Sequence, residues 1–88
     1  MAELTLSPDA EEDLINICIF TEERWGIKQR IKYHDQLENR MFDLADNPEK
    51  GRIRHELKNA PRFYHEGRHS IFYKEIDNGI EIVRILHG

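Results

Sequence analysis

The C-terminal stretch from Gly67 to Gly88 constrains the fold of this chain most, because it has the pattern of two β-strands joined by a tight turn. Asn78-Gly79 is a strong hairpin signal, since both central residues of a type I′ turn need a positive φ. Ile, Phe, Tyr and Val flank this dipeptide on both sides, as a pleated and packed surface favours. The sequence therefore predicts a terminal β-hairpin.

The pairing across this hairpin follows from the turn. With Asn78 and Gly79 as the loop, counting outward predicts these facing pairs: Asp77 with Ile80, Lys74 with Val83, Tyr73 with Arg84, Phe72 with Ile85 and Ser70 with His87. Side chains alternate along a strand, so one face is expected to hold Ser70, Phe72, Lys74, Val83, Ile85 and His87, and the other Ile71, Tyr73, Ile82, Arg84 and Leu86. Both faces are largely apolar. We expect the chain's own helices to cover one face and a partner to cover the other.

The 88 residues are expected to form a single domain, 1–88, that is too short for two independent cores. No apolar run reaches the roughly 20 residues of a membrane helix. The N-terminal MAELTLSPDAEED lacks the basic and apolar segments of a secretion signal, so a cytoplasmic protein is expected. Cys18 is the only cysteine, which excludes an internal disulfide, and its place in an apolar helix predicts an inert thiol.

Charge is unevenly distributed along the chain, whose net charge is −4. Residues 51–74 carry six basic and two acidic side chains, although the chain as a whole is acidic. This basic segment could attract an acidic partner or nucleic acid. The alternative, which charge alone favours, is a solvated loop and an edge strand protected by charge. Direct sequence-specific binding of nucleic acid is not expected.

The chain in order predicts an α+β domain of β-α-α-β-β-β order. Ser7-Pro8 begins a first helix that ends at Trp25-Gly26, and a second helix, Ile27 to Asp46, ends at Asn47-Pro48. A loop is expected over 49–61. Strands are predicted at Ala2–Leu6, at Arg62–His65 and in the terminal hairpin. Runs of helix and then of strand indicate a helical hairpin packed on one face of a small, mainly antiparallel sheet.

The first helix carries more apolar surface than one core contact needs. Leu14, Ile17, Cys18, Thr21 and Trp25 form a stripe at helical spacing, and Ile15, Ile19 and Phe20 widen it. Either the helix is sandwiched within the fold, or a second face docks another protein. The second helix is expected to turn Ile27, Ile31, His34, Leu37, Met41, Leu44 and Ala45 inward.

The sequence contains no Gly-rich phosphate loop, no CxxC and no HExxH, so neither a metal nor a cofactor is expected. One acid–base set deserves weighing. Ser70, Lys74 and His87, with His55 or Glu56 nearby, could supply the base, the cation and the acid that RNA cleavage needs. Because Phe72, Val83 and Ile85 lie between them, this face could equally be the covered core.

Four ordered segments resemble the ParE toxins of the RelE/ParE superfamily, the toxin halves of bacterial toxin–antitoxin operons: LSPDAEEDL, FTEERWG, LADNP and GRHSIFYKEIDNGIEIVRILH. The resemblance implies a ParD-type antitoxin whose C-terminal segment folds on the toxin. It also implies DNA gyrase (the A subunit) as the target, stalled on cleaved DNA without catalysis by the toxin. A homodimer or a toxin–antitoxin hetero-oligomer is expected. ParE-like chains commonly run a few residues past the position of His87, and the resemblance implies that this C-terminal end is important for toxicity.

The superfamily's other branch cleaves ribosome-bound mRNA. The arginine that this branch carries on the penultimate strand corresponds to Ser70 here, so the ribonuclease pattern is broken and a non-enzymatic toxin is expected. The alternatives are a ribonuclease that uses His87, Lys74 and Arg68, or a degenerate, non-toxic member. The antitoxin is expected to contact an apolar and basic set: Leu14, Ile15, Ile19, Phe20, Trp25, Arg62, Arg68, Tyr73 and Arg84.

Overall fold

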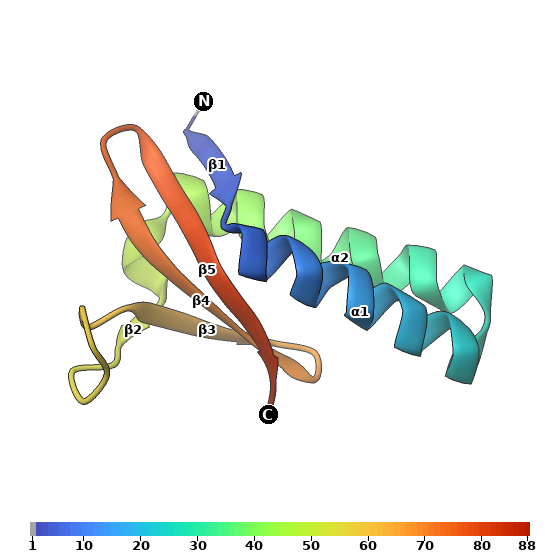
Figure 1. The fold of residues 1–88 in the computed structure, drawn as a ribbon. Helices are drawn as coiled ribbons and strands as arrows, with labels where there is room; N and C mark the ends of the chain where they lie inside the picture. The colour runs from blue at the N-terminus through green and yellow to red at the C-terminus, as the bar shows by residue number, and fades with distance from the viewer. Residues whose placement is uncertain (1) are drawn as a thin grey trace.

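The computed structural model describes residues 2–88 and confirms the predicted order of elements (Figure 1). Its elements are β1 (Glu3–Leu6), α1 (Pro8–Trp25), α2 (Ile27–Asp46), the 3₁₀ helix η1 (Pro48–Lys50), β2 (Arg52–Ile53), β3 (Arg62–Glu66), β4 (His69–Ile76) and β5 (Gly79–His87). The predicted loop over 49–61 thus contains η1 and a short strand. Within residues 2–88, neither helix is long and apolar enough to cross a membrane.

Local capping signals set the bounds of the helical hairpin. The Ser7 side chain accepts a hydrogen bond from the Ala10 N–H at 3.0 Å, and Pro8 occupies the first turn, where a missing N–H costs nothing. Gly26, with a φ of 93°, separates the two helices, and its N–H donates to the Glu22 carbonyl at 2.8 Å. A residue with a side chain is strained at this φ, so glycine makes the sharp reversal possible.

The five strands form one mixed sheet in the order β1-β5-β4-β3-β2, and the helices cover one face of it (Figure 1). Three pairs of neighbours are antiparallel, whereas β1 runs parallel to β5. Glycine is required at position 79, because a Cβ there would lie 1.8 Å from the Glu3 carbonyl oxygen. Gly79 therefore lets the backbone of β1 approach β5.

The predicted register of the terminal hairpin is wrong. Ile76 pairs with Gly79, so the loop is Asp77-Asn78, and neither Asn78 nor Gly79 has a positive φ. A bulge at Val83 then shifts the register once more. The observed pairs are Tyr73 with Ile82, Lys74 with Glu81, Phe72 with Arg84, Ser70 with Leu86 and His69 with His87. The expected pairs of Tyr73 with Arg84, Lys74 with Val83 and Ser70 with His87 do not form.

The core lies between the helices and one face of the sheet. Because of the bulge, Ile85 joins Ile71 and Tyr73 on this face, instead of sharing a face with Phe72 as predicted. Phe72 stacks on Phe63 with 5.9 Å between ring centroids. The buried apolar residues are Ala10, Ile17, Leu37, Met41, Leu44, Ala45, Ile71, Tyr73, Ile80, Ile82 and Ile85.

Tyr73 anchors the loop after α2 to the sheet. Its side chain is fully buried, and its hydroxyl donates to the Pro48 carbonyl at 2.6 Å and accepts from the Gly51 N–H at 2.8 Å. A Cβ on Gly51 would lie 2.2 Å from this hydroxyl, so only glycine fits there. The expectation that Tyr73 contacts an antitoxin is therefore corrected: its side chain is a buried anchor and presents no surface.

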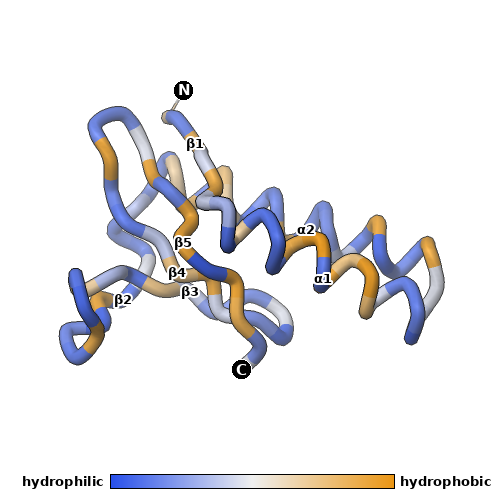
Figure 2. Tube along the Cα trace, in the orientation of Figure 1, coloured by the Kyte–Doolittle hydropathy of each residue, from blue (hydrophilic) through white to orange (hydrophobic). Residues whose placement is uncertain are grey.

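The outer half of the α1–α2 hairpin extends beyond the sheet (Figure 1). The buried residues of α2 are confined to its second half, from Leu37 to Ala45. Ile27 and Ile31, predicted to face inward, are 56% and 48% exposed. Apolar segments in the middle and outer parts of the hairpin are visible in Figure 2. This part of the fold consequently presents apolar side chains that the sheet does not cover.

Candidate functional site: an apolar hairpin surface and a C-terminal cleft

The exposed apolar residues of the outer hairpin form what we call the hairpin surface. It consists of Ile15, Ile19, Phe20, Trp25, Ile27 and Ile31, which are 48–61% exposed. In α1, Ile15 and Ile19 lie on the side of the helix away from the buried stripe of Ile17 and Thr21, whereas Phe20 lies beside the stripe. The centre of the wide stripe thus packs in the core, and its outer residues are exposed. That this exposed part docks another protein stays a prediction.

A groove runs between the two helices on the Ile15–Ile19 flank. Its apolar lining comes from Leu14, Ile15, Cys18 and Ile19, and its rim includes Glu22 and Arg30, which form an ion pair at 2.8 Å. Burial raises the pKa of the half-buried Cys18 thiol, which keeps it protonated and unreactive at neutral pH. The groove matches the apolar face of an amphipathic helix with polar residues along its edges.

Two of the three arginines predicted to contact an antitoxin already have partners. Arg62 donates to the Gly51 carbonyl at 2.9 Å and lies 3.4 Å from a Glu75 carboxylate oxygen. Arg84 makes two hydrogen bonds to the Asp13 carboxylate, at 2.8 and 2.9 Å. Of the three, only Arg68 has no carboxylate partner among residues 2–88.

Asp13 ties α1 to the last strand. Besides binding Arg84, its carboxylate accepts from the Ile85 N–H at 3.0 Å. The hydrogen bond from Arg84 is the main reason why the pKa of Asp13 lies below its ordinary value, and the Ile85 N–H acts in the same direction against the effect of burial. The carboxylate is thus held charged at neutral pH as a structural link, with Arg84 as its partner within the chain.

A second hollow, which we call the C-terminal cleft, lies where the helical hairpin meets the ends of β4 and β5. It encloses about 570 Å³ and includes Trp25, Tyr33, Arg68, His69 and His87 in its lining. Arg68 and His87, two members of the predicted ribonuclease set, therefore share one site.

The third member, Lys74, does not belong to the cleft. It pairs with Glu81 at 3.3 Å, whereas His87 pairs across the hairpin with His69. Five residues of extended strand between 69 and 74 correspond to roughly 17 Å. Ser70 is also engaged elsewhere, since its hydroxyl donates to the Gly88 carbonyl at 2.9 Å. The predicted set of Ser70, Lys74 and His87 is therefore not assembled.

Tyr33 and His69 are functional candidates that the sequence analysis missed. The Tyr33 hydroxyl accepts from the Arg68 N–H at 3.0 Å and lies 2.6 Å from His69 Nδ1. The same hydroxyl donates to the Glu66 carbonyl at 3.4 Å, so Tyr33 contacts three groups of the β3–β4 turn. The rings of His69 and His87 meet edge to face, 5.5 Å apart. The one signal in the sequence for this site was Tyr33, an aromatic residue with a polar hydroxyl in the mostly exposed first half of α2.

Burial and neighbouring charge adjust the acid–base properties of these groups. Burial lowers the pKa of His69, and the nearby His87 and His65 lower it further. Burial also raises the pKa of the Tyr33 hydroxyl. Both groups are therefore neutral at pH 7 in the free protein, and an anion that entered the cleft would favour protonation of His69.

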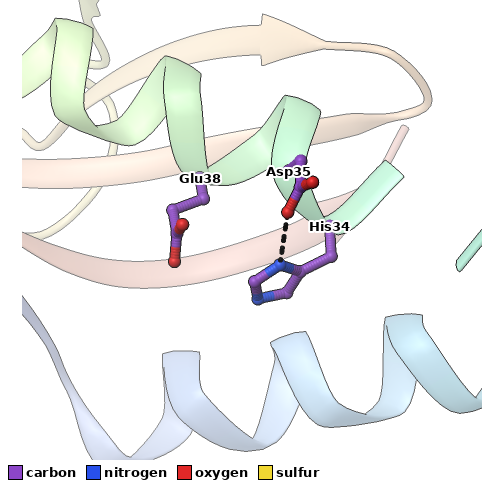
Figure 3. A group of neighbouring side chains, drawn as sticks. All are labelled: His34, Asp35 and Glu38. Carbon is purple, nitrogen blue, oxygen red and sulfur yellow. Dashed lines mark hydrogen bonds and ion pairs between the residues drawn. The ribbon is translucent and has the colours of Figure 1, made fainter. Parts of the chain in front are cut away.

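His34, Asp35 and Glu38 form a group on α2 that could offer ligands to a cation (Figure 3). Their ligand atoms lie within 4.8 Å of one another, and His34 Nδ1 is 3.4 Å from the Asp35 carboxylate. His34 is half-buried, as predicted, but the two carboxylates are exposed. The spacing of four residues between His34 and Glu38, one turn of helix, is the signal of this group in the sequence. Within residues 2–88 this is the one group whose ligand atoms lie that close together, and exposed carboxylates of this kind are common without an ion.

The structure is that of a small α+β protein whose helical hairpin presents exposed apolar side chains. Comparisons with known proteins identify its family. Residues 4–88 match the family model described as "ParE toxin of type II toxin-antitoxin system, parDE". The chain is 36% identical over 83 residues to Toxin ParE1 of Mycobacterium tuberculosis, covering 93% of this chain and 85% of that protein. It is 32% identical over 87 residues to Toxin ParE1 of Caulobacter vibrioides, covering 99% and 90%.

A solved structure described as a chromosomal ParDE TA system from P. aeruginosa shares the fold, with a TM-score of 0.82 at 20% identity over 99% of this chain and 96% of that one. The chain therefore belongs to the ParE toxin family of type II toxin–antitoxin systems. The predicted superfamily and its fold are confirmed.

Proposed function

We propose that a ParD-type antitoxin neutralises this toxin by laying an amphipathic helix along the groove between α1 and α2. The observation that carries the proposal is the hairpin surface, whose six large apolar side chains are about half exposed in an otherwise polar chain. Exposed apolar area of this kind stabilises a complex when a partner removes it from water. The contact is assigned to Leu14, Ile15, Ile19, Phe20, Trp25 and Arg68 from the predicted set, and Ile27 and Ile31 are added.

The test is the affinity for the antitoxin encoded beside this toxin, measured by isothermal titration calorimetry. Ile19→Asp places a charge in the groove and should weaken binding at least about 30-fold, as expected for a central apolar contact. Ile53→Asp is the matched control, because Ile53 is also exposed (40%) but lies on β2, away from the hairpin. Equal losses for the two variants would remove the groove from the interface.

We infer that the free toxin acts by binding the A subunit of DNA gyrase, and that it performs no catalysis of its own. Family membership supports this inference, and so does the separation of Lys74 from His87, which leaves the predicted ribonuclease set incomplete. Such a toxin acts in the cytoplasm, where its target and antitoxin are found. A homodimer in the absence of antitoxin would use the same hairpin surface, which light scattering of the free toxin would detect.

Purified gyrase provides the direct test. Addition of the toxin should block supercoiling and trap cleaved DNA, and addition of antitoxin should restore supercoiling. Cut mRNA in a translation extract, with no effect on gyrase, would instead establish the ribonuclease alternative. No effect in either assay would identify a non-toxic member that retains antitoxin binding.

A further inference from the structure

The C-terminal cleft has a composition unlike that of the rest of the molecule. The chain has 17 acidic and 13 basic side chains, yet no carboxylate lines the cleft within the described residues 2–88. Its lining instead carries one arginine and two histidines. Glu66, the nearest acid in sequence, is occupied by Arg40 and Gln36, each at 2.7 Å. An anion that entered would therefore meet donors without facing a repelling charge.

Arg68 is available to bind such an anion. Its guanidinium carbon lies 6.0 Å from the centroid of the Trp25 ring, a cation–π arrangement that leaves its N–H donors free. The backbone beneath it is held in place, because the Arg68 N–H donates to Tyr33 and the Arg68 carbonyl accepts from the Gly88 N–H at 3.1 Å. The loop also fits closely against Tyr33, since a Cβ on Gly67 would lie 2.6 Å from its ring. The arginine therefore extends from an ordered support.

The remaining lining suits a planar ring with polar edges. Phe20 and Trp25 supply an aromatic wall and are 61% and 54% exposed. Gln29 adds a side-chain amide that can donate and accept at the edge of a nucleobase, and Gln36, whose amide nitrogen donates to Glu66, offers its amide oxygen. Aromatic side chains stack on bases of any identity, and arginine is a preferred ligand of phosphate. The volume of about 570 Å³ lies in the range of small-ligand sites.

We propose that the C-terminal cleft binds a nucleotide, with its phosphate on Arg68, His69 and His87 and its base against Phe20 and Trp25. An acidic peptide would use the cations but would leave the aromatic wall and the two amides without a role. The nucleotide can come from free solution or from the end of a nucleic-acid strand, and the chemistry of recognition is the same. The cleft adjoins the α1–α2 groove and shares Phe20, Trp25 and Arg68 with the contact proposed for the antitoxin, so nucleotide and antitoxin are expected to compete. Binding requires no cleavage of the ligand.

The proposal is tested by titrating the full chain with adenosine 5′-monophosphate and recording ¹H–¹⁵N NMR spectra at each step. Trp25 is the only tryptophan, so its fluorescence reports on the cleft as a second readout. Shifts should concentrate at Trp25, Arg68, His69 and His87. Arg68→Ala should weaken binding by roughly tenfold or more, as expected for the loss of a charge-assisted contact. Arg52→Ala is the control, because Arg52 is exposed on β2 and forms no ion pair within the described residues 2–88.

Further ligands separate the outcomes. Adenosine and inorganic phosphate should each bind more weakly than the nucleotide, because each uses only one half of the cleft. A 5′-phosphorylated dinucleotide that binds more tightly than the mononucleotide would identify a strand end as the source, and equal affinities would identify a free nucleotide. An unchanged affinity in Arg68→Ala, equal binding of adenosine, or equal binding of a diaspartyl peptide would overturn the proposal.

The pH dependence of the same titration is a further check. The groups that face His69 are Tyr33 from α2, His87 from β5 and His65 from β3. Since none of them carries a negative charge at neutral pH, nucleotide affinity should rise as the pH falls from about 8 to about 6 and the histidines become protonated. An affinity that does not change over this range would exclude the histidines from the phosphate site.

Discussion

Replacing Tyr73 with phenylalanine removes a single oxygen atom and tests how the sheet is anchored to the loop after α2. The hydroxyl satisfies two backbone groups, the Pro48 carbonyl at 2.6 Å and the Gly51 N–H at 2.8 Å. Each would be left without a partner beneath a fully buried ring. An unsatisfied buried polar group costs about 1–3 kcal/mol, so we expect Tyr73→Phe to lose about 2–4 kcal/mol of unfolding free energy.

This loss is large for a domain of 88 residues. Domains of this size have unfolding free energies of roughly 5–10 kcal/mol, and 1 kcal/mol shifts the melting temperature by about 4–8 °C. The variant should therefore melt at least about 8 °C below the wild type, as measured by circular dichroism and by urea titration. Antitoxin affinity of the folded variant should not change, because Tyr73 has no exposed surface.

Tyr64→Phe is the matched control. Tyr64 is half-buried on the neighbouring strand, and its hydroxyl makes no hydrogen bond to another of residues 2–88. Its ring, 4.6 Å from the guanidinium carbon of Arg40, is retained in the variant. We expect a change below about 0.5 kcal/mol. If the two variants lost the same stability, the anchoring role of the Tyr73 hydroxyl would be refuted.

Three further predictions concern the ends of the sheet. Asp13→Asn should destabilise the fold at neutral pH. A carboxylate with a lowered pKa stabilises the native state above its unfolded value of 3.8 and loses that contribution as the pH falls through the folded value, so the difference from the wild type should shrink as the pH falls below 3.8. Equal acid unfolding curves would contradict this. Gly79→Ala should displace β1, since the new Cβ would lie 1.8 Å from the Glu3 carbonyl oxygen, so the Glu3 and Ser7 amides should exchange hydrogen faster while α2 stays protected. Lys74→Ala should change stability by less than about 1 kcal/mol and leave gyrase inhibition intact, since its ion pair with Glu81 is exposed.

Local signals account for what could be predicted from the sequence. Helix capping and termination depend on neighbouring residues only, here on Ser7-Pro8, Gly26 and Asn47-Pro48. Both helices therefore begin and end where the sequence predicts. The hairpin turn lies one residue earlier than predicted. Gly79 has no positive φ; glycine is needed there because the backbone of β1, distant in sequence, packs closely against it. The bulge at Val83 likewise involves a residue distant in sequence: the Ser7 hydroxyl donates to the Val83 carbonyl at 2.8 Å.

The candidate sites likewise divide into a part that local sequence patterns predict and a part that depends on tertiary packing. The apolar flanks of α1 could be identified from helical spacing, and their exposure followed once the hairpin was seen to extend beyond the sheet. The C-terminal cleft could not be identified in this way, because Trp25, Tyr33, Arg68 and His87 meet only through tertiary packing. Tyr73 looked like part of a cross-strand surface pair, but its alternation in the sheet did not reveal which face the helices cover.

The pairing of β1 with β5 has a consequence for how the toxin comes into being during synthesis. The first strand of the described sheet cannot find its place until residues 79–82 have left the ribosome. The hairpin surface, in contrast, is encoded between residues 15 and 31, and its two helices are neighbours in the chain. Local contacts form faster than those that close long loops. An antitoxin that binds the hairpin can therefore capture a nascent toxin before the sheet, and the harmful activity with it, is complete.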